Sequence, residues 1–90
     1  MKTRVAALSI IVEDPESVET INEILHEARS YVVGRMGIPY PKRGISIISL
    51  VLDAPQDTIS HVAGKVGALE GVSVKVAYST YEFEDGVAGE

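Results

Sequence analysis

The chain has 90 residues, of which 46% are hydrophobic and 23% charged, and it contains no cysteine. This length and composition are typical of one globular domain with a single core, and no apolar run is long enough to cross a membrane. The lack of cysteine excludes disulfides, thiolate catalysis and cysteine-held zinc or iron–sulfur sites, and the net charge of −5 argues against direct binding of nucleic acid. We expect a cytoplasmic protein, because the first residues lead into a strand without the apolar core of a signal peptide.

Hydrophobic periodicity divides the chain into six elements. Runs rich in β-branched residues predict strands, and apolar residues three or four apart predict amphipathic helices. Asp14-Pro15 and Asp53-Ala54-Pro55 mark the two helix starts, because an aspartate cap and a proline at the first helical position favour the first turn. The expected elements are a strand over residues 4–13, a helix from 14 to about 29, strands over about 31–38 and over 45–53, a helix over 55–69 and a strand over 72–79.

This order, βαββαβ, predicts an α+β fold of the ferredoxin-like, ACT-like type. Such a fold has a four-stranded antiparallel sheet with both helices on one face. We assign residues 1–81 to this domain and expect the acidic residues 82–90 to form a flexible tail.

The first and third expected strands are apolar on both faces. Their alternating sets are Leu8, Ile10 and Val12 against Val5, Ala7 and Ile11 in the first, and Ile48, Leu50 and Leu52 against Ile45, Ile47 and Val51 in the third. Because the helices cover one face only, the other face needs a second subunit. We therefore predict a homodimer or tetramer that packs through the sheet and its edge strands.

Residues 34–44 (GRMGIPYPKRG) interrupt every periodic pattern and follow a sharp change of charge. Residues 13–27 hold six acids and no base, whereas residues 28–52 hold four bases and no acid. Glycine lets another molecule approach closely, arginine and lysine pair with carboxylate or phosphate, and tyrosine offers a flat contact. The candidate residues for binding a small anionic effector or a partner protein are Gly34, Arg35, Gly37, Tyr40, Lys42 and Arg43. The alternative is a rigid hairpin whose cations meet the acids of the first helix across a subunit boundary.

Two further pairs of residues have a structural and a functional interpretation. Gly64 and Gly67 are unfavourable inside a helix, so we expect them to permit close packing against a neighbouring element or a bound molecule. His26 and His61, with carboxylates, are the alternative candidates for a metal-binding sensor, although solvated helix histidines are the more common case. No nucleophile elbow, nucleotide fingerprint or Walker motif is present, so we expect neither an enzyme nor a bound cofactor.

Four segments together carry a family resemblance. They are Val33 to Tyr40 followed by Gly44 to Leu50, then Gly64 to Gly67, then Leu69 to Lys75. The chain resembles, over about residues 5–79, the small proposed regulators of iron-only hydrogenase systems. That family is similar to ACT domains and to the carboxy-terminal domain of nickel-responsive repressors, which are ferredoxin-like, oligomeric and ligand-sensing. The resemblance implies regulation rather than catalysis.

Two departures from these relatives restrict what the resemblance implies. Amino-acid-binding ACT domains have Asp-x-Pro-Gly after the first strand, and this chain has Glu16 where that glycine would lie. The nickel repressors use several histidines and a cysteine, whereas this chain has two histidines and no cysteine. Neither that amino-acid site nor that nickel site is expected.

Overall fold

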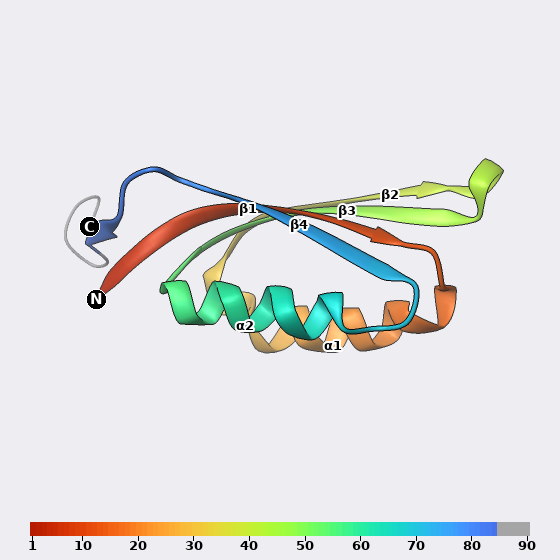
Figure 1. Ribbon diagram of the computed structural model, residues 1–90, viewed down its shortest axis with the longest axis horizontal. Coiled ribbons are helices and arrows are strands. Elements are labelled where there is room, and N and C mark those ends of the chain that lie inside the picture. Colours follow the sequence, from red (N-terminus) through yellow and green to blue (C-terminus); the bar gives the residue numbers. More distant parts are fainter. Residues whose placement is uncertain (85–90) are drawn as a thin grey trace.

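Four long strands form an antiparallel sheet, and two helices cover one of its faces (Figure 1). The structure is a computed structural model and describes residues 1–84. The elements are β1 (Lys2–Val12), η1 (Pro15–Ser17), α1 (Val18–Glu27), η2 (Arg29–Tyr31), β2 (Val32–Tyr40), η3 (Pro41–Arg43), β3 (Ile45–Ala54), α2 (Gln56–Gly67), β4 (Val72–Tyr78) and β5 (Phe83–Glu84). The predicted ferredoxin-like βαββαβ order is confirmed. Within residues 1–84 no helix is long and apolar enough to cross a membrane.

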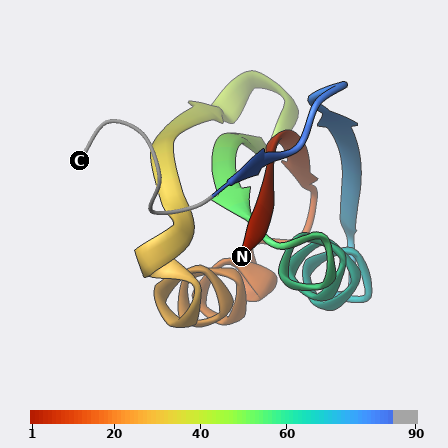
Figure 2. The same ribbon diagram turned by 90° about the vertical axis from the view of Figure 1, so that its left-hand side faces the viewer.

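The sheet has the order β2-β3-β1-β4, so the two most apolar strands lie in its centre. Seen along the sheet, both helices lie side by side beneath it, and no helix or strand of residues 1–84 covers its other face (Figure 2). We call this uncovered surface the open face. The sequence missed one strand: β5, at the start of the expected tail, pairs with the beginning of β1. The rest of that tail, residues 85–90, lies outside the described residues.

The core fills the space between the sheet and the helices. Its side chains come from alternate positions of β1 and β3 and from one stripe on each helix, as the periodicity predicts. The buried set is Ala6, Leu8, Ile10, Val12, Ile21, Ile24, Leu25, Ala28, Ile48, Leu50, Leu52, Ala54, Ile59, Val62 and Val66. These residues use one face of each central strand, which leaves the apolar residues of the other face for the open side.

Two turns fix the ends of the elements. The predicted cap at Asp14 is present, since its Oδ1 accepts a hydrogen bond from Glu16 N at 3.0 Å, but it begins the 3-10 turn η1 rather than α1 itself. Before β4, Gly71 has φ 69°, and a Cβ there would lie 2.9 Å from Asp14 N. Only glycine fits this position, because both the backbone conformation and the space exclude a side chain.

A β-bulge in β2 decides the orientation of the segment singled out by the sequence. Val32 pairs with Leu52 and Gly34 pairs with Val51, so Val33 is the extra residue. A one-residue shift moves every following side chain to the other face of a sheet. Beyond the bulge, Arg35 therefore lies on the helix side and Met36 on the open face.

Candidate functional site

The open face carries a continuous apolar surface across β2, β3 and β1. Ile38 pairs with Ile47, and Ile47 pairs with Ile11, so these three form a row across the strands. We call them the isoleucine row. Met36 and Tyr40 flank Ile38 on β2, and the exposed fractions of Met36, Ile38 and Tyr40 are 56%, 44% and 42%. Exposed apolar side chains grouped in this way are typical of interaction sites.

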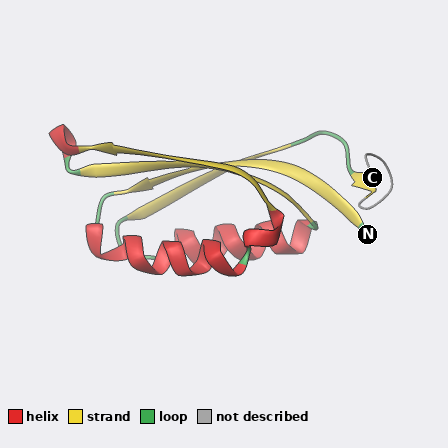
Figure 3. Ribbon diagram, turned by 180° about the vertical axis from the view of Figure 1, so that it is seen from behind, coloured by secondary structure: helices red, strands yellow, loops and turns green. Residues whose placement is uncertain are grey.

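The structure separates the sequence-predicted binding residues instead of gathering them into one site. Arg35 turns toward α1, where its Nη2 donates a hydrogen bond to Asn22 Oδ1 at 2.6 Å. Tyr40 lies on the open face opposite Ile45 in the register. Lys42 and Arg43 lie in the short helical turn η3, which connects β2 and β3 at the tip of their hairpin (Figure 3). The set therefore contributes to three different surfaces.

Within the described chain, neither backbone conformation nor lack of space requires glycine at the two glycine positions of β2. Gly34 and Gly37 lack a positive φ, and a Cβ at either would meet nothing within 4 Å. Gly44 differs, because its φ of 67° lets the hairpin close after η3. Space is therefore available beside Gly34 on the open face and beside Gly37 on the helix side, and their role in ligand or partner binding stays a prediction.

A cleft of about 410 Å³ opens on the helix side, between α1 and β2. We call it the α1–β2 cleft. Its lining combines three apolar side chains with two arginines, a histidine and an asparagine, namely Asn22, Leu25, His26, Arg29, Val32, Arg35 and Leu50. The sequence analysis named Arg35 and His26 for separate reasons and missed the rest. The signal that could have found the cleft was the absence of acids between residues 28 and 52.

The helix glycines have no close neighbour within the described chain. A Cβ at Gly64 would meet nothing within 4 Å, and one at Gly67 would lie 3.8 Å from Val74 Cγ2, an ordinary contact. Packing against a neighbouring element of the same chain therefore does not require them. Close packing against another molecule stays a prediction for both.

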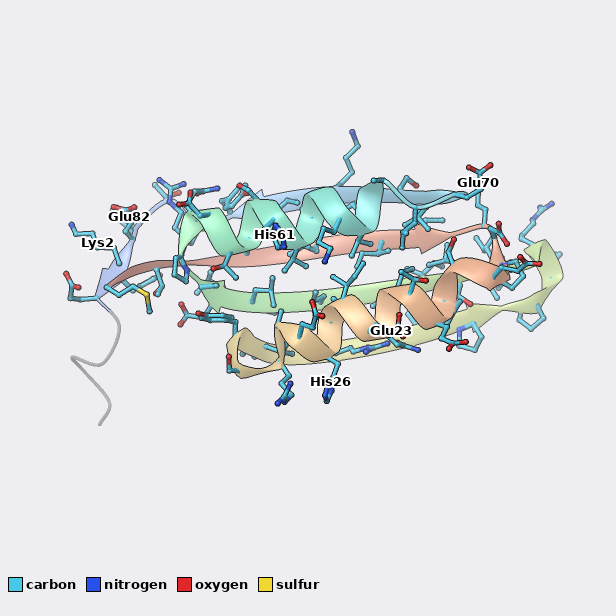
Figure 4. All side chains as sticks on the ribbon, turned by 90° about the horizontal axis from the view of Figure 1, so that it is seen from below. Lys2, Glu23, His26, His61, Glu70 and Glu82 are labelled. Carbon is cyan, nitrogen blue, oxygen red and sulfur yellow. The ribbon has the colours of Figure 1, made fainter. Side chains whose placement is uncertain are left out.

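The two histidines lie on different helices and line different clefts. His26 lies on the flank of α1 away from α2, and His61 lies on α2 (Figure 4). His61 lines a small cleft between the helices, whereas His26 lines the α1–β2 cleft. No group of three or more His, Asp or Glu side chains that could hold a metal ion is formed by residues 1–84. The geometry of a single chain does not favour the metal-sensor alternative.

Comparison with known proteins now places this architecture in a family. Residues 4–76 match the family described as "TM1266-like: Iron-only hydrogenase system regulator, putative". The chain belongs to this family. A solved structure of the uncharacterized protein TM1266 from Thermotoga maritima is 34% identical, with a TM-score of 0.81, and the match covers 87% of this chain and 98% of that one. A search by sequence among curated proteins finds no significant match.

More distant solved structures share the fold alone. One is the apo form of CPII from Thiomonas intermedia K12, a nitrogen regulatory PII-like protein, at 14% identity and a TM-score of 0.55, covering 93% of this chain and 98% of that one. Another is a formyltetrahydrofolate deformylase from Pseudomonas putida KT2440, at 16% identity and a TM-score of 0.59. That match covers 81% of this chain but 28% of the deformylase chain. The TM1266-like family thus uses a fold found in proteins of different function.

Proposed function

We propose that this member of the TM1266-like family is a stand-alone regulatory module, not an enzyme, that acts as a homo-oligomer in the cytoplasm. The main observation in favour of a homo-oligomer is the isoleucine row on the open face. It runs from edge strand β2 to central strand β1 near the hairpin end of the open face, where a second sheet can pack face to face against it at about 10 Å.

The charges around the open face support the same arrangement. Among the residues that the register aligns with Gly34, Met36 and Ile38 across the sheet, Lys75 on β4 is the one charged side chain. Interfaces between identical subunits are depleted of charge at their centre and enriched in methionine and aromatic residues. The exposed Met36 and Tyr40 fit this composition. The outer edge of β2, which pairs with no other strand in residues 1–84, extends the candidate surface and fits the predicted use of the edge strands.

A regulatory module responds to an effector, and we propose that this effector is a small anion or a partner protein. The cations of the hairpin tip, Lys42 and Arg43, which form no ion pair within residues 1–84, and the space beside Gly34 and Gly37 are the features available for it. The family description suggests the pathway, an iron-only hydrogenase system. The metal-sensor alternative, through His26 and His61, would require ligands from outside residues 1–84 of one chain.

Native mass spectrometry of untagged protein purified from its source tests this function. The expected result is a multiple of the 9.6 kDa chain, and any retained effector or metal ion appears as added mass. Light scattering on purified protein provides the independent mass. A mass of one chain at micromolar concentration would contradict the proposed oligomer.

A further inference from the structure

The α1–β2 cleft lies on the opposite side of the sheet from the proposed interface. Its apolar part is formed by Leu25 of α1, Val32 of β2 and Leu50 of β3. Its volume, about 410 Å³, falls within the range of about 300–1,000 Å³ that small-molecule sites occupy. The cleft therefore stays accessible when two sheets pack together, and a metabolite-sized molecule fits it.

Both arginines of the cleft are held by neutral acceptors. Arg35 donates to the side-chain oxygen of Asn22 at 2.6 Å, and Arg29 donates through Nη1 to the carbonyl of His26 at 2.8 Å. Within residues 1–84, neither guanidinium lies within 4.0 Å of a carboxylate; the ion pairs there join Lys65 to Glu27, Arg4 to Glu82 and the amino terminus to Glu84. In a chain with 13 acids and 8 bases, two arginines in one cleft without a carboxylate are available for an external anion.

The helix α1 separates its charges by face. Glu23 and Glu27 line a different cleft, between α1 and α2, beside Lys65. The face of α1 toward β2 instead presents Asn22 and His26. None of the three acids of α1, Glu19, Glu23 and Glu27, lines the cleft that holds the two arginines.

We infer that the α1–β2 cleft binds a small organic anion that carries a carboxylate or phosphate group. The charged group lies between Arg29 and Arg35, because guanidinium groups bind such oxyanions through paired hydrogen bonds. The apolar part of the molecule lies against Val32, the half-buried member of the apolar lining, because Leu25 and Leu50 are already buried in the core. Asn22 is a positioning residue, because its oxygen holds the Arg35 guanidinium at the cleft. The site deepens the proposed regulatory function, on which its biological meaning rests, by naming where an anionic effector binds.

The test is a titration of the full chain, labelled with nitrogen-15, with three probes at constant ionic strength. The probes are phenyl phosphate, benzoate and inorganic phosphate, and amide shifts in proton–nitrogen correlation spectra locate binding. We expect saturable shifts around residues 22–35, and at least about threefold tighter binding of one aromatic probe than of inorganic phosphate, because the ring covers the exposed part of Val32. Whichever aromatic probe binds more tightly identifies the charged group. No saturable shifts in the cleft, or equal affinity of all three probes, would overturn the inference.

Matched variants separate a built site from general electrostatic attraction. We expect Arg35→Gln and Arg29→Gln each to weaken the aromatic probe by about tenfold or more, since each removes a charged hydrogen-bond donor. Lys2→Gln removes the same charge at the exposed start of β1, away from the cleft, and should leave the affinity unchanged within about twofold. Dispersed spectra show that each variant is folded. If Lys2→Gln weakens binding as much as Arg35→Gln, the attraction is nonspecific and the site is refuted.

The outcomes for the cleft and for the oligomer are distinguishable. The light-scattering mass depends on the open face, whereas the titration depends on the helix side. A single-chain mass with specific probe binding refutes the oligomer and supports the cleft. An oligomeric mass without specific probe binding supports the oligomer and refutes the cleft.

Discussion

Substitution of Ile38 by lysine is the sharpest test of the proposed interface. Ile38 lies in the isoleucine row, on edge strand β2, and 44% of it is exposed in the single chain. A lysine is well tolerated on an edge strand of a monomer, so the fold should persist. The same lysine at the centre of an interface places a charge against Ile47 and the partner sheet.

The expected magnitude follows from burial. Complete burial of an isoleucine contributes about 1.5–3 kcal/mol, so covering the exposed 44% of Ile38 contributes about 1 kcal/mol per subunit. Loss of that contribution, together with about 1 kcal/mol or more for desolvating the ammonium group, occurs twice in a symmetric dimer. The total loss is about 4 kcal/mol, which raises Kd about 10³-fold.

The assay is light scattering coupled to size exclusion, at loading concentrations from about 1 to 100 μM. We expect wild type to elute as an oligomer and Ile38→Lys as a single chain with unchanged circular dichroism. Ala68→Lys is the matched control, because it adds the same charge at an exposed position just after α2, on the helix side. An unchanged mass for Ile38→Lys, or equal dissociation of both variants, would refute the assignment of the interface to the open face.

Three substitutions test the local packing by urea denaturation. Gly71→Ala should lower the free energy of unfolding by about 2–4 kcal/mol, because alanine is strained at φ 69° and its Cβ would clash with Asp14. An unchanged urea midpoint would show that this turn relaxes freely. Gly64→Ala should raise it by about 0.5–1 kcal/mol, because the site is in a helix interior and has open space; a loss of stability or of assembly would instead reveal a contact with another molecule. Ser17→Ala should lower it by about 1 kcal/mol, because the buried Oγ donates to the Glu70 carbonyl at 2.8 Å, whereas a neutral effect would mean that water replaces this bond.

The two binding surfaces respond to different variants, which makes combined experiments informative. Ile38→Lys alters the open face and leaves the lining of the α1–β2 cleft intact. Arg35→Gln alters the cleft and leaves the isoleucine row intact. If both proposals hold, a change of oligomer mass on adding phenyl phosphate measures the coupling between effector and assembly.

Much of the fold could be predicted because its signals are local. Alternation in β1 and β3, the cap at Asp14 and the stripe of α1 each depend on neighbouring residues, and the structure has all three. Element ends were less accurate: α2 runs from Gln56 to Gly67 rather than over 55–69. The short strand β5 was missed because two residues give no periodic pattern and their pairing with β1 is nonlocal.

The candidate site was harder to predict because it depends on which side of the sheet each residue faces. By itself the sequence determined that residues 34–44 are unusual, that their charge is positive and that the central strands are apolar on both faces. Without the bulge at Val33, Arg35 would face the open side and Met36 the helices. The bulge sends Arg35 to Asn22 and places Met36 and Ile38 on the open face. Only the pairing with β3 decides this, because strand alternation specifies two faces but not which of them the helices cover.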